Sequence, residues 1–188
     1  MGQPKESLPF GGSTLLGRTV ELLLEVTWPV VIVARPDQQL PPLPLESRTL
    51  TDAEPGNGPL QAIATGMRWL RGEGGLGDRD AVFVTGCDAP YLTSAVVSWL
   101  AARLGDGQLV VPRVGGVVQP LCALYRLDVL PAVEALLAEK ADAPKRLVDR
   151  VRTRAVDEPE LRELDPQLRF VVSVDTPEEY RAALGAGS

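Results

Sequence analysis

The fold of this chain is decided by the stretch Ala81-Val82-Phe83-Val84-Thr85-Gly86-Cys87-Asp88-Ala89-Pro90-Tyr91-Leu92. Its first five residues form a short apolar, β-branched run, which is typical of a strand buried on both faces. Small residues and a proline end that strand and leave one carboxylate, Asp88, at its tip. Because ligands of open α/β sheets bind outside the carboxyl ends of strands, Asp88 is placed to hold a metal ion against a phosphate. The alternative is that Asp88 caps a helix that begins near Leu92 or Thr93.

The composition excludes several classes of function. The 188 residues are 45% hydrophobic and 23% charged, as in an ordinary globular domain. A formal net charge of -6 argues against nucleic acid or an anionic membrane as partner, and no membrane span or signal peptide pattern is found, so we expect a cytoplasmic protein. The chain has no histidine, which excludes Ser-His-Asp and Cys-His catalysis and histidine-bound metals. Cys87 and Cys122 are expected to be small core residues.

Strands and helices are expected to alternate along the chain. The predicted strands cover residues 30–34, 48–50, 81–85, 109–112, 118–125 and 170–174, with an edge strand beginning near residue 156. The predicted helices cover residues 13–25, 59–71, 93–104, 128–140 and 145–151, and a last helix begins at residues 175–177. This alternation predicts an α/β fold of three layers with a mostly parallel sheet, and one domain over residues 1–188.

Four residues carry the chemistry that this fold predicts. Lys5 lies in a polar opening loop, Asp52 precedes a Gly-Asn-Gly-Pro turn, and Asp88 and Asp175 each follow a predicted strand. Strand ends of an α/β sheet can converge on one crevice, where carboxylates and a lysine suit metal-assisted phosphoryl or nucleotidyl transfer. Like Asp88, the other three residues also have a purely structural explanation. Under it, Lys5 is a solvated charge, Asp52 is a turn residue and Asp175 is a helix cap.

Several motifs resemble the molybdenum cofactor guanylyltransferases, a branch of the nucleotidyltransferases, in order and spacing. They are residues 1–12, 52–60, 86–92 and 119–125, and residues 175–179 resemble the ending of those proteins. The resemblance spans nearly the whole chain. It implies a Rossmann-like nucleotidyltransferase domain that transfers GMP from GTP to molybdopterin, with Mg²⁺ as cofactor and pyrophosphate as product.

The same resemblance implies roles for individual residues. Lys5 would be catalytic and would contact the GTP phosphates, and Asp52 would bind the nucleotide. Gly58 and Pro59 would shape the pocket for the base. Asp88 would be catalytic, and it would hold Mg²⁺ between the phosphates.

Asp175 departs from the guanylyltransferase pattern. It falls, with Ser173, where those proteins often carry a pair of asparagines. An aspartate there resembles a second metal ligand of the cytidylyltransferases or the wider nucleotidyltransferases. A cytidylyl- or other nucleotidyltransferase is therefore one alternative, and a non-catalytic nucleotide-binding or scaffold domain is another.

The beginning of the chain also departs from the family pattern. In the family, a strand and a glycine-rich phosphate loop precede the segment that resembles residues 1–12. Alternation likewise calls for a strand before the helix that begins at Ser13. We therefore expect that the first strand and the glycine-rich loop are missing, and that the full-length polypeptide extends upstream by roughly 15–20 residues.

Overall fold

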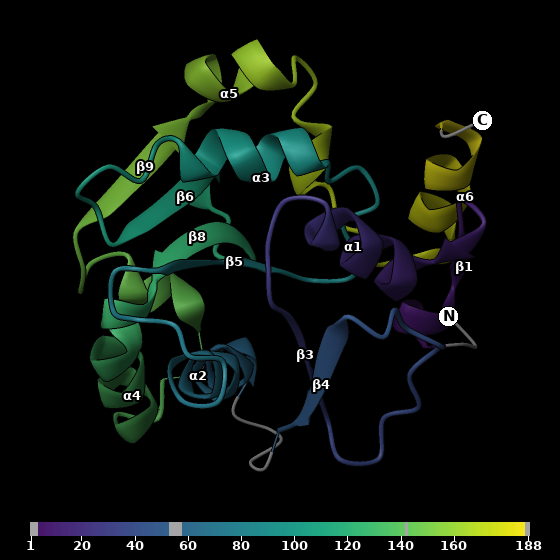
Figure 1. Ribbon diagram of the computed structural model, residues 1–188. Helices are drawn as coiled ribbons and strands as arrows, with labels where there is room; N and C mark the ends of the chain where they lie inside the picture. The colour runs from purple at the N-terminus through teal and green to yellow at the C-terminus, as the bar shows by residue number, and fades with distance from the viewer. Residues whose placement is uncertain (1–3, 53–57, 142, 187–188) are drawn as a thin grey trace.

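The computed structural model describes residues 4–52, 58–141 and 143–186, and helices cover both faces of its larger sheet (Figure 1). That sheet contains β5 (Ala81–Thr85), β6 (Leu109–Val114), β7 (Val117–Val118), β8 (Cys122–Arg126) and β9 (Thr153–Asp157). Strand β8 lies between β5 and β6 and is antiparallel to both. Strand β6 also pairs with β9 in parallel and with β7 antiparallel.

The prediction of a mostly parallel sheet is not confirmed, because the chain returns from β6 without a helical crossover. Gly115 and Gly116 form the connection to β7 with φ angles of 59° and 76°, which favour glycine. Parallel neighbours need a longer crossover, so this short turn makes the next strand antiparallel. Gln119 and Pro120 then interrupt the strand predicted over residues 118–125, and its second half is β8.

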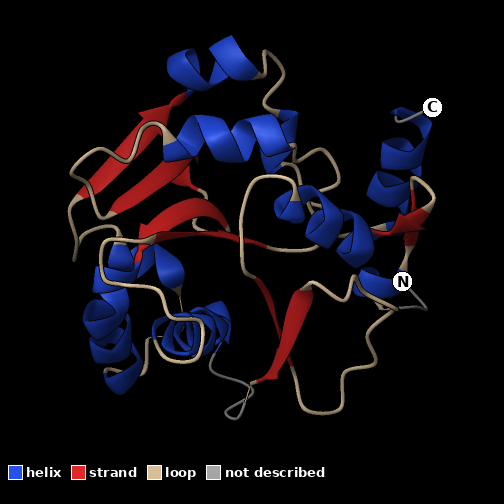
Figure 2. Ribbon diagram, viewed as in Figure 1, coloured by secondary structure: helices blue, strands red, loops and turns tan. Residues whose placement is uncertain are grey.

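A second, two-stranded sheet contains β3 (Val30–Ala34) and β4 (Ser47–Thr51), which are parallel (Figure 2). Helix α1 (Leu15–Leu24) precedes it and α2 (Gly58–Arg71) follows it. The Thr14 hydroxyl accepts a hydrogen bond from the Gly17 N–H at 3.0 Å, so Thr14 is the N-cap of α1, the helix that the sequence predicted over residues 13–25.

The larger sheet has a hydrophobic core on each face. Leu109, Val111, Ala123 and Tyr125 pack with residues of α2 and α4 (Leu130–Ala138). The alternating residues of these strands, on the opposite face, include Val110, Cys122 and Leu124. They pack with residues of α3 (Ser94–Ala101) and α5 (Glu158–Leu164). Because side chains alternate between the faces of a strand, these two sets confirm the predicted three layers. Cys122 is a core residue, and Cys87 is half-buried.

The remaining helices agree with the predictions in part. Residues 127–129 form a short 3₁₀ turn ahead of α4, and the helix predicted over residues 145–151 is the 3₁₀ helix Pro144–Leu147. Helix α5 was not predicted, and α6 (Pro177–Ala186) was. In the part of the chain that the structure describes, no helix has the length and hydropathy to cross a membrane.

The strand predicted over residues 170–174 is wrong. Leu168 has a φ of 54°, and the Asp165 carboxylate accepts hydrogen bonds from the Arg169 and Phe170 N–H groups, which folds the chain into the 3₁₀ helix Arg169–Val171. Phe170 is anchored in the core, and its apolar neighbours in sequence produced the strand-like pattern. Farther on, the Val174 N–H donates to the Asp88 carbonyl at 2.8 Å and brings this segment beside β5.

The polar N-terminal segment is more ordered than a loop. It contains the 3₁₀ helix Lys5–Ser7 and a hairpin of β1 (Pro9–Phe10) and β2 (Ser13–Thr14). Gly11 and Gly12 connect the two strands with φ angles of 57° and 85°, which a Gly-Gly hairpin turn requires. Phe10 packs with residues of α6 in one apolar cluster, so the two ends of the described chain lie together (Figure 1).

Candidate functional site

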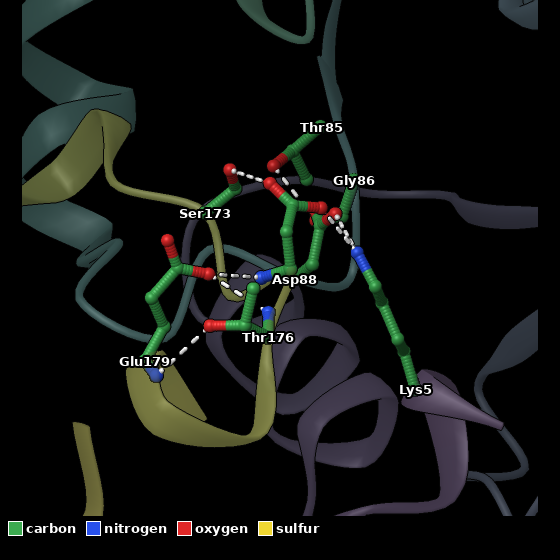
Figure 3. A network of polar contacts seen from close by, with 8 residues as sticks. Lys5, Thr85, Gly86, Asp88, Ser173, Thr176 and Glu179 are labelled. Carbon is green, nitrogen blue, oxygen red and sulfur yellow. Dashed lines mark hydrogen bonds and ion pairs between the residues drawn. The ribbon is translucent and has the colours of Figure 1, made fainter. Parts of the chain in front are cut away.

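Three charged side chains from distant parts of the chain meet beyond the end of β5 (Figure 3). The Lys5 ammonium lies 3.5 Å from Oδ2 of Asp88 and 2.5 Å from Oδ1 of Asp175. The side chains of Lys5 and Asp88 are each about two-thirds buried, with 33% and 32% of their surface exposed. The Asp175 side chain is 61% exposed. The structure therefore brings together three of the four residues that the sequence predicted to converge.

Asp88 is not a helix cap. The Thr93 hydroxyl accepts the hydrogen bond from the Val96 N–H at 3.4 Å and caps α3, so the capping alternative for Asp88 is wrong. The carboxylate instead folds back over Gly86, where a Cβ atom would lie 2.5 Å from Oδ1 of Asp88. A glycine at this position thus leaves room for the carboxylate to point toward Lys5 (Figure 3).

Asp175 is not the cap of α6 either. Thr176 is the N-cap, because its hydroxyl accepts from the Glu179 N–H at 3.2 Å, and the Glu179 carboxylate accepts from the Thr176 N–H at 2.8 Å. This reciprocal pair is a capping box. The same carboxylate accepts from the Asp175 N–H, also at 2.8 Å, which leaves the Asp175 side chain to bond Lys5 and the Ser173 hydroxyl.

The Lys5 segment is fixed by contacts that the sequence gave no reason to expect. The Glu6 side chain is buried, and its carboxylate accepts a hydrogen bond from Gln38 Nε2 at 2.6 Å. The Tyr180 hydroxyl donates to the Pro9 carbonyl. No sequence motif marks Glu6 or Gln38, because a buried carboxylate and its distant amide partner leave no periodic signal.

Lys5, Asp175 and a neighbouring thiol have shifted pKa values. Burial lowers the pKa of Lys5, but the Asp175 hydrogen bond and the Asp88 charge outweigh it, so the net shift is upward. The hydrogen bonds from Lys5 and Ser173 lower the pKa of Asp175. Burial, followed by the charges of Asp88 and Glu6, raises the pKa of Cys87 to about 11, so this thiol stays protonated at neutral pH.

We predict a small, pH-dependent effect of Asp175→Asn on thermal stability. The Asp175 pKa lies below its ordinary 3.8, so the stabilising Lys5 pair is present above that pH and is lost as pH falls through the lower folded value. The Lys5 pKa lies above 10.5, so the contribution is also lost at high pH. At neutral pH the loss should not exceed about 1 kcal/mol, because Asp175 is exposed to solvent.

This prediction is tested by melting curves recorded between pH 3 and 11. They compare the wild type with Asp175→Asn and with Asp149→Asn, a control at an exposed aspartate. The difference between wild type and Asp175→Asn should shrink at both ends of the range. A difference independent of pH would contradict the ion pair.

The other predicted nucleotide-binding residues lie elsewhere. Asp52 follows β4, is buried with 7% of its surface exposed, and donates its N–H to the Ala34 carbonyl at 2.7 Å. Gly58 and Pro59 begin α2, and Pro59 lines a cavity between β3 and β5. Residues 53–57 of the predicted turn lie outside the described residues. The nucleotide-binding roles of Asp52, Gly58 and Pro59 remain predictions.

Comparison with known proteins identifies the family. The model of the MobA-like NTP transferase domain matches residues 1–156. The chain belongs to this family. As a MobA-like NTP transferase it is an enzyme of the nucleotidyltransferase class, and the resemblance inferred from its motifs is confirmed.

Similar proteins carry related names. A probable molybdenum cofactor guanylyltransferase of Mycobacterium tuberculosis is 36% identical over 153 residues, which cover 79% of this chain and 73% of that protein. A probable molybdenum cofactor guanylyltransferase of Carboxydothermus hydrogenoformans is 27% identical over 184 residues, covering 98% of this chain and 88% of that protein.

Solved structures confirm the α/β nucleotidyltransferase fold. Molybdopterin-guanine dinucleotide biosynthesis protein A of Archaeoglobus fulgidus superimposes with a TM-score of 0.78 at 17% identity, covering 99% of this chain and 91% of that one. The 2-C-methyl-D-erythritol 4-phosphate cytidylyltransferase of Thermus thermophilus gives 0.71 at 17% identity, with 97% and 93% covered. The protein Rv0371c of Mycobacterium tuberculosis, in complex with manganese, gives 0.60 at 18% identity, with 98% and 93% covered.

Proposed function

We propose that this MobA-like NTP transferase transfers GMP from GTP to molybdopterin. A phosphate oxygen of the acceptor attacks the α-phosphorus of GTP, the bond between the α-phosphorus and the bridging oxygen breaks, and pyrophosphate leaves. Such a reaction depends on neutralising and positioning phosphate charge more than on a protein nucleophile.

The observation that carries this proposal is the convergence of Asp88 and Asp175 on one cation, the Lys5 ammonium. Two carboxylates that already share a positive charge fit Mg²⁺, which takes one or two carboxylates and fills its remaining positions with water and phosphate oxygens. Among the described residues no group of three or more metal-ligating side chains occurs. Bound Mg²⁺ would offset the charge of the phosphates, and a structural neighbour of this chain is a manganese complex.

The residues of the chain then act by charge and position. In the proposed complex, Lys5 donates hydrogen bonds to the phosphate oxygens of GTP, and Asp88 and Asp175 are freed to hold the metal ion. Cys87 does not supply a nucleophile, because its pKa of about 11 keeps the thiol protonated, and the chain contains no histidine to activate one. Direct transfer between the two phosphates is therefore the favoured route.

The choice of GTP and molybdopterin rests on the names of the relatives, and one feature favours a second candidate. Asp175 supplies a carboxylate to the site, and a cytidylyltransferase shares this fold. Transfer of CMP from CTP is thus the alternative.

We further propose that residues 1–188 act as one domain in the cytoplasm, without nucleic acid or a membrane as partner, in keeping with the net charge of -6.

A nucleotide screen tests the proposal. Thermal shifts are measured with GTP, CTP, ATP and UTP, each with Mg²⁺, and pyrophosphate release is measured after molybdopterin is added. A nucleotide that binds the folded state alone raises its stability, by about 2.7 kcal/mol at a hundred times its Kd. GTP should give the largest shift and the only acceptor-dependent release. Release with CTP alone would favour the second candidate, and binding without release of pyrophosphate would contradict both.

A substitution at Gly86 should impair this activity without unfolding the protein. A Cβ at residue 86 would occupy the space of Oδ1 of Asp88, so Gly86→Ala should turn the carboxylate away from Lys5. We expect the rate of transfer to fall roughly 10-fold or more, because electrostatic groups act through precise placement. The control is Gly77→Ala, where the nearest atom outside the chain neighbours lies 3.8 Å from the Cβ position. Equal rates for the two variants would contradict the role assigned to Gly86.

A further inference from the structure

The turn that carries Lys5 also buries a carboxylate. Lys5 and Glu6 are neighbours in the 3₁₀ helix Lys5–Ser7, yet their side chains have different surroundings. The Lys5 side chain is 33% exposed and reaches Asp88 (Figure 3), whereas Glu6 is buried, with 8% of its surface exposed. Burial of a carboxylate is unfavourable, and an apolar side chain would fill the same space at a lower cost. Packing alone therefore does not explain Glu6.

Glu6 is bound to the segment that follows β3. Its Oε1 atom accepts a hydrogen bond from Nε2 of Gln38 at 2.6 Å. Gln38 is itself fixed at the other end of its amide, because its Oε1 atom accepts from the Arg35 N–H at 3.1 Å. The Gln38 N–H donates to the carbonyl groups of Arg35 and Pro36, at 3.1 and 2.8 Å. The side chain and the backbone of Gln38 thus belong to one tight turn, and Glu6 is tied to that turn.

The same segment packs against the residue before Asp88. Leu40, two residues after Gln38, belongs to an apolar cluster that includes Cys87. Burial, the charge of Asp88 and then the charge of Glu6 raise the pKa of Cys87, so the Glu6 carboxylate lies near this thiol. The segment after β3 is therefore held against the end of β5 as well as against the Lys5 turn.

These contacts form a closed ring around the ion pair. From Lys5 the ring leads to the neighbouring Glu6 and across the hydrogen bond to Gln38. The apolar cluster then leads to Cys87, whose neighbour Asp88 contacts Lys5 again. Because a lysine side chain is long and flexible, the place of its ammonium depends on how firmly the backbone at its base is held. The hydrogen bond between Glu6 and Gln38 is the link that holds this backbone.

We propose that Glu6 and Gln38 are positioning residues for Lys5. Their hydrogen bond keeps the Lys5 turn where the ammonium reaches Asp88 and, in the nucleotide complex, the phosphates. The statement about the nucleotide rests on the proposed function, whereas the statement about Asp88 does not. Glu6→Gln keeps an acceptor oxygen and should preserve the position of Lys5. Glu6→Leu and Gln38→Leu replace the hydrogen bond by apolar side chains of similar size and should release it.

The first experiment uses the nucleotide-free protein. Competitive acetylation with limiting acetic anhydride, followed by mass spectrometry, compares the labelling of Lys5 with that of the exposed Lys140. Glu6→Leu and Gln38→Leu should raise the relative labelling of Lys5, because its amine is no longer held between carboxylates. Glu6→Gln and the matched control Gln39→Leu, at the exposed neighbour of Gln38, should leave it unchanged. Unchanged labelling in both of the first two variants would overturn the proposal.

The second experiment asks whether Gln38 acts through Lys5. Isothermal titration with GTP and Mg²⁺ is performed on Gln38→Leu, Lys5→Ala and the double variant. Loss of one hydrogen bond should weaken binding by roughly 3- to 10-fold in the wild-type background. It should weaken binding no further in the Lys5→Ala background, because no ammonium is left to be positioned. An equal loss in both backgrounds would indicate a general structural effect and would overturn the proposal.

The two experiments separate the positioning role from the proposed function. If the wild type does not bind GTP, the proposed function fails, and acetylation still decides what holds Lys5. If the wild type binds GTP and Gln38→Leu changes neither labelling nor affinity, the positioning role fails and the proposed function stands. Melting curves check that each variant is folded. Gln38 lies half-buried in a surface turn, so Gln38→Leu decides the outcome if Glu6→Leu does not fold.

Discussion

Asp88→Asn is expected to lose most of the Mg²⁺-dependent nucleotidyl transfer while its melting temperature stays close to that of the wild type. A neutral amide has nearly the same shape as the carboxylate, but it offsets neither the metal charge nor the charge of Lys5. Loss of one electrostatic contact to the reacting phosphates typically costs on the order of 100-fold or more in rate. The rate at saturating nucleotide and the thermal shift with and without Mg²⁺ together measure the effect.

The control for this variant is Asp37→Asn, an exposed aspartate in the turn after β3. It makes the same chemical change away from the Lys5 cluster and should keep the wild-type rate. Because Thr93 and not Asp88 caps α3, a large drop in the melting temperature of Asp88→Asn is not expected. Wild-type turnover in Asp88→Asn would contradict the proposed metal site.

Lys5→Ala is expected to weaken nucleotide binding by roughly 10- to 100-fold. This corresponds to the loss of one hydrogen bond to a charged group, which contributes about 1.5–3 kcal/mol. The melting temperature should change little, because the ammonium is one-third exposed and its ion pairs are partly screened. Isothermal titration with GTP and Mg²⁺ measures the affinity. Lys145→Ala, at an exposed lysine of the 3₁₀ helix Pro144–Leu147, is the control. A large drop in melting temperature at unchanged affinity would make Lys5 a structural residue.

Much of the fold was predictable because its elements have strong local signals. The helix α1 has a capping residue, Thr14, and an apolar face, and the strands 30–34 and 81–85 are continuous apolar runs rich in β-branched residues. The position of Asp88 followed directly from the end of such a strand. Lys5 and Asp175 were found through motif order, since neither residue has a local pattern that separates a site from a solvated charge or a cap.

The errors came from features that depend on tertiary contacts. The sequence between β6 and β8 does not show by periodicity whether a strand returns parallel or antiparallel, and the glycine turn at residues 115–116 decides it. The run 170–174 is apolar because Phe170 and Val174 fill two different clusters, which gives it the composition of a strand without a strand partner. The Gly-Gly turn at residues 11–12 was a signal for the N-terminal hairpin that the polar composition obscured.

The contact between Lys5 and Asp175 joins residues 170 positions apart, and this separation affects the protein during its synthesis. Lys5 leaves the ribosome early, and its partner is added roughly 10–30 s later at ordinary elongation rates. Throughout that interval Lys5 has no Asp175 carboxylate with which to form its ion pair. The cluster of three charges is therefore complete only once synthesis and folding have both reached the beginning of α6.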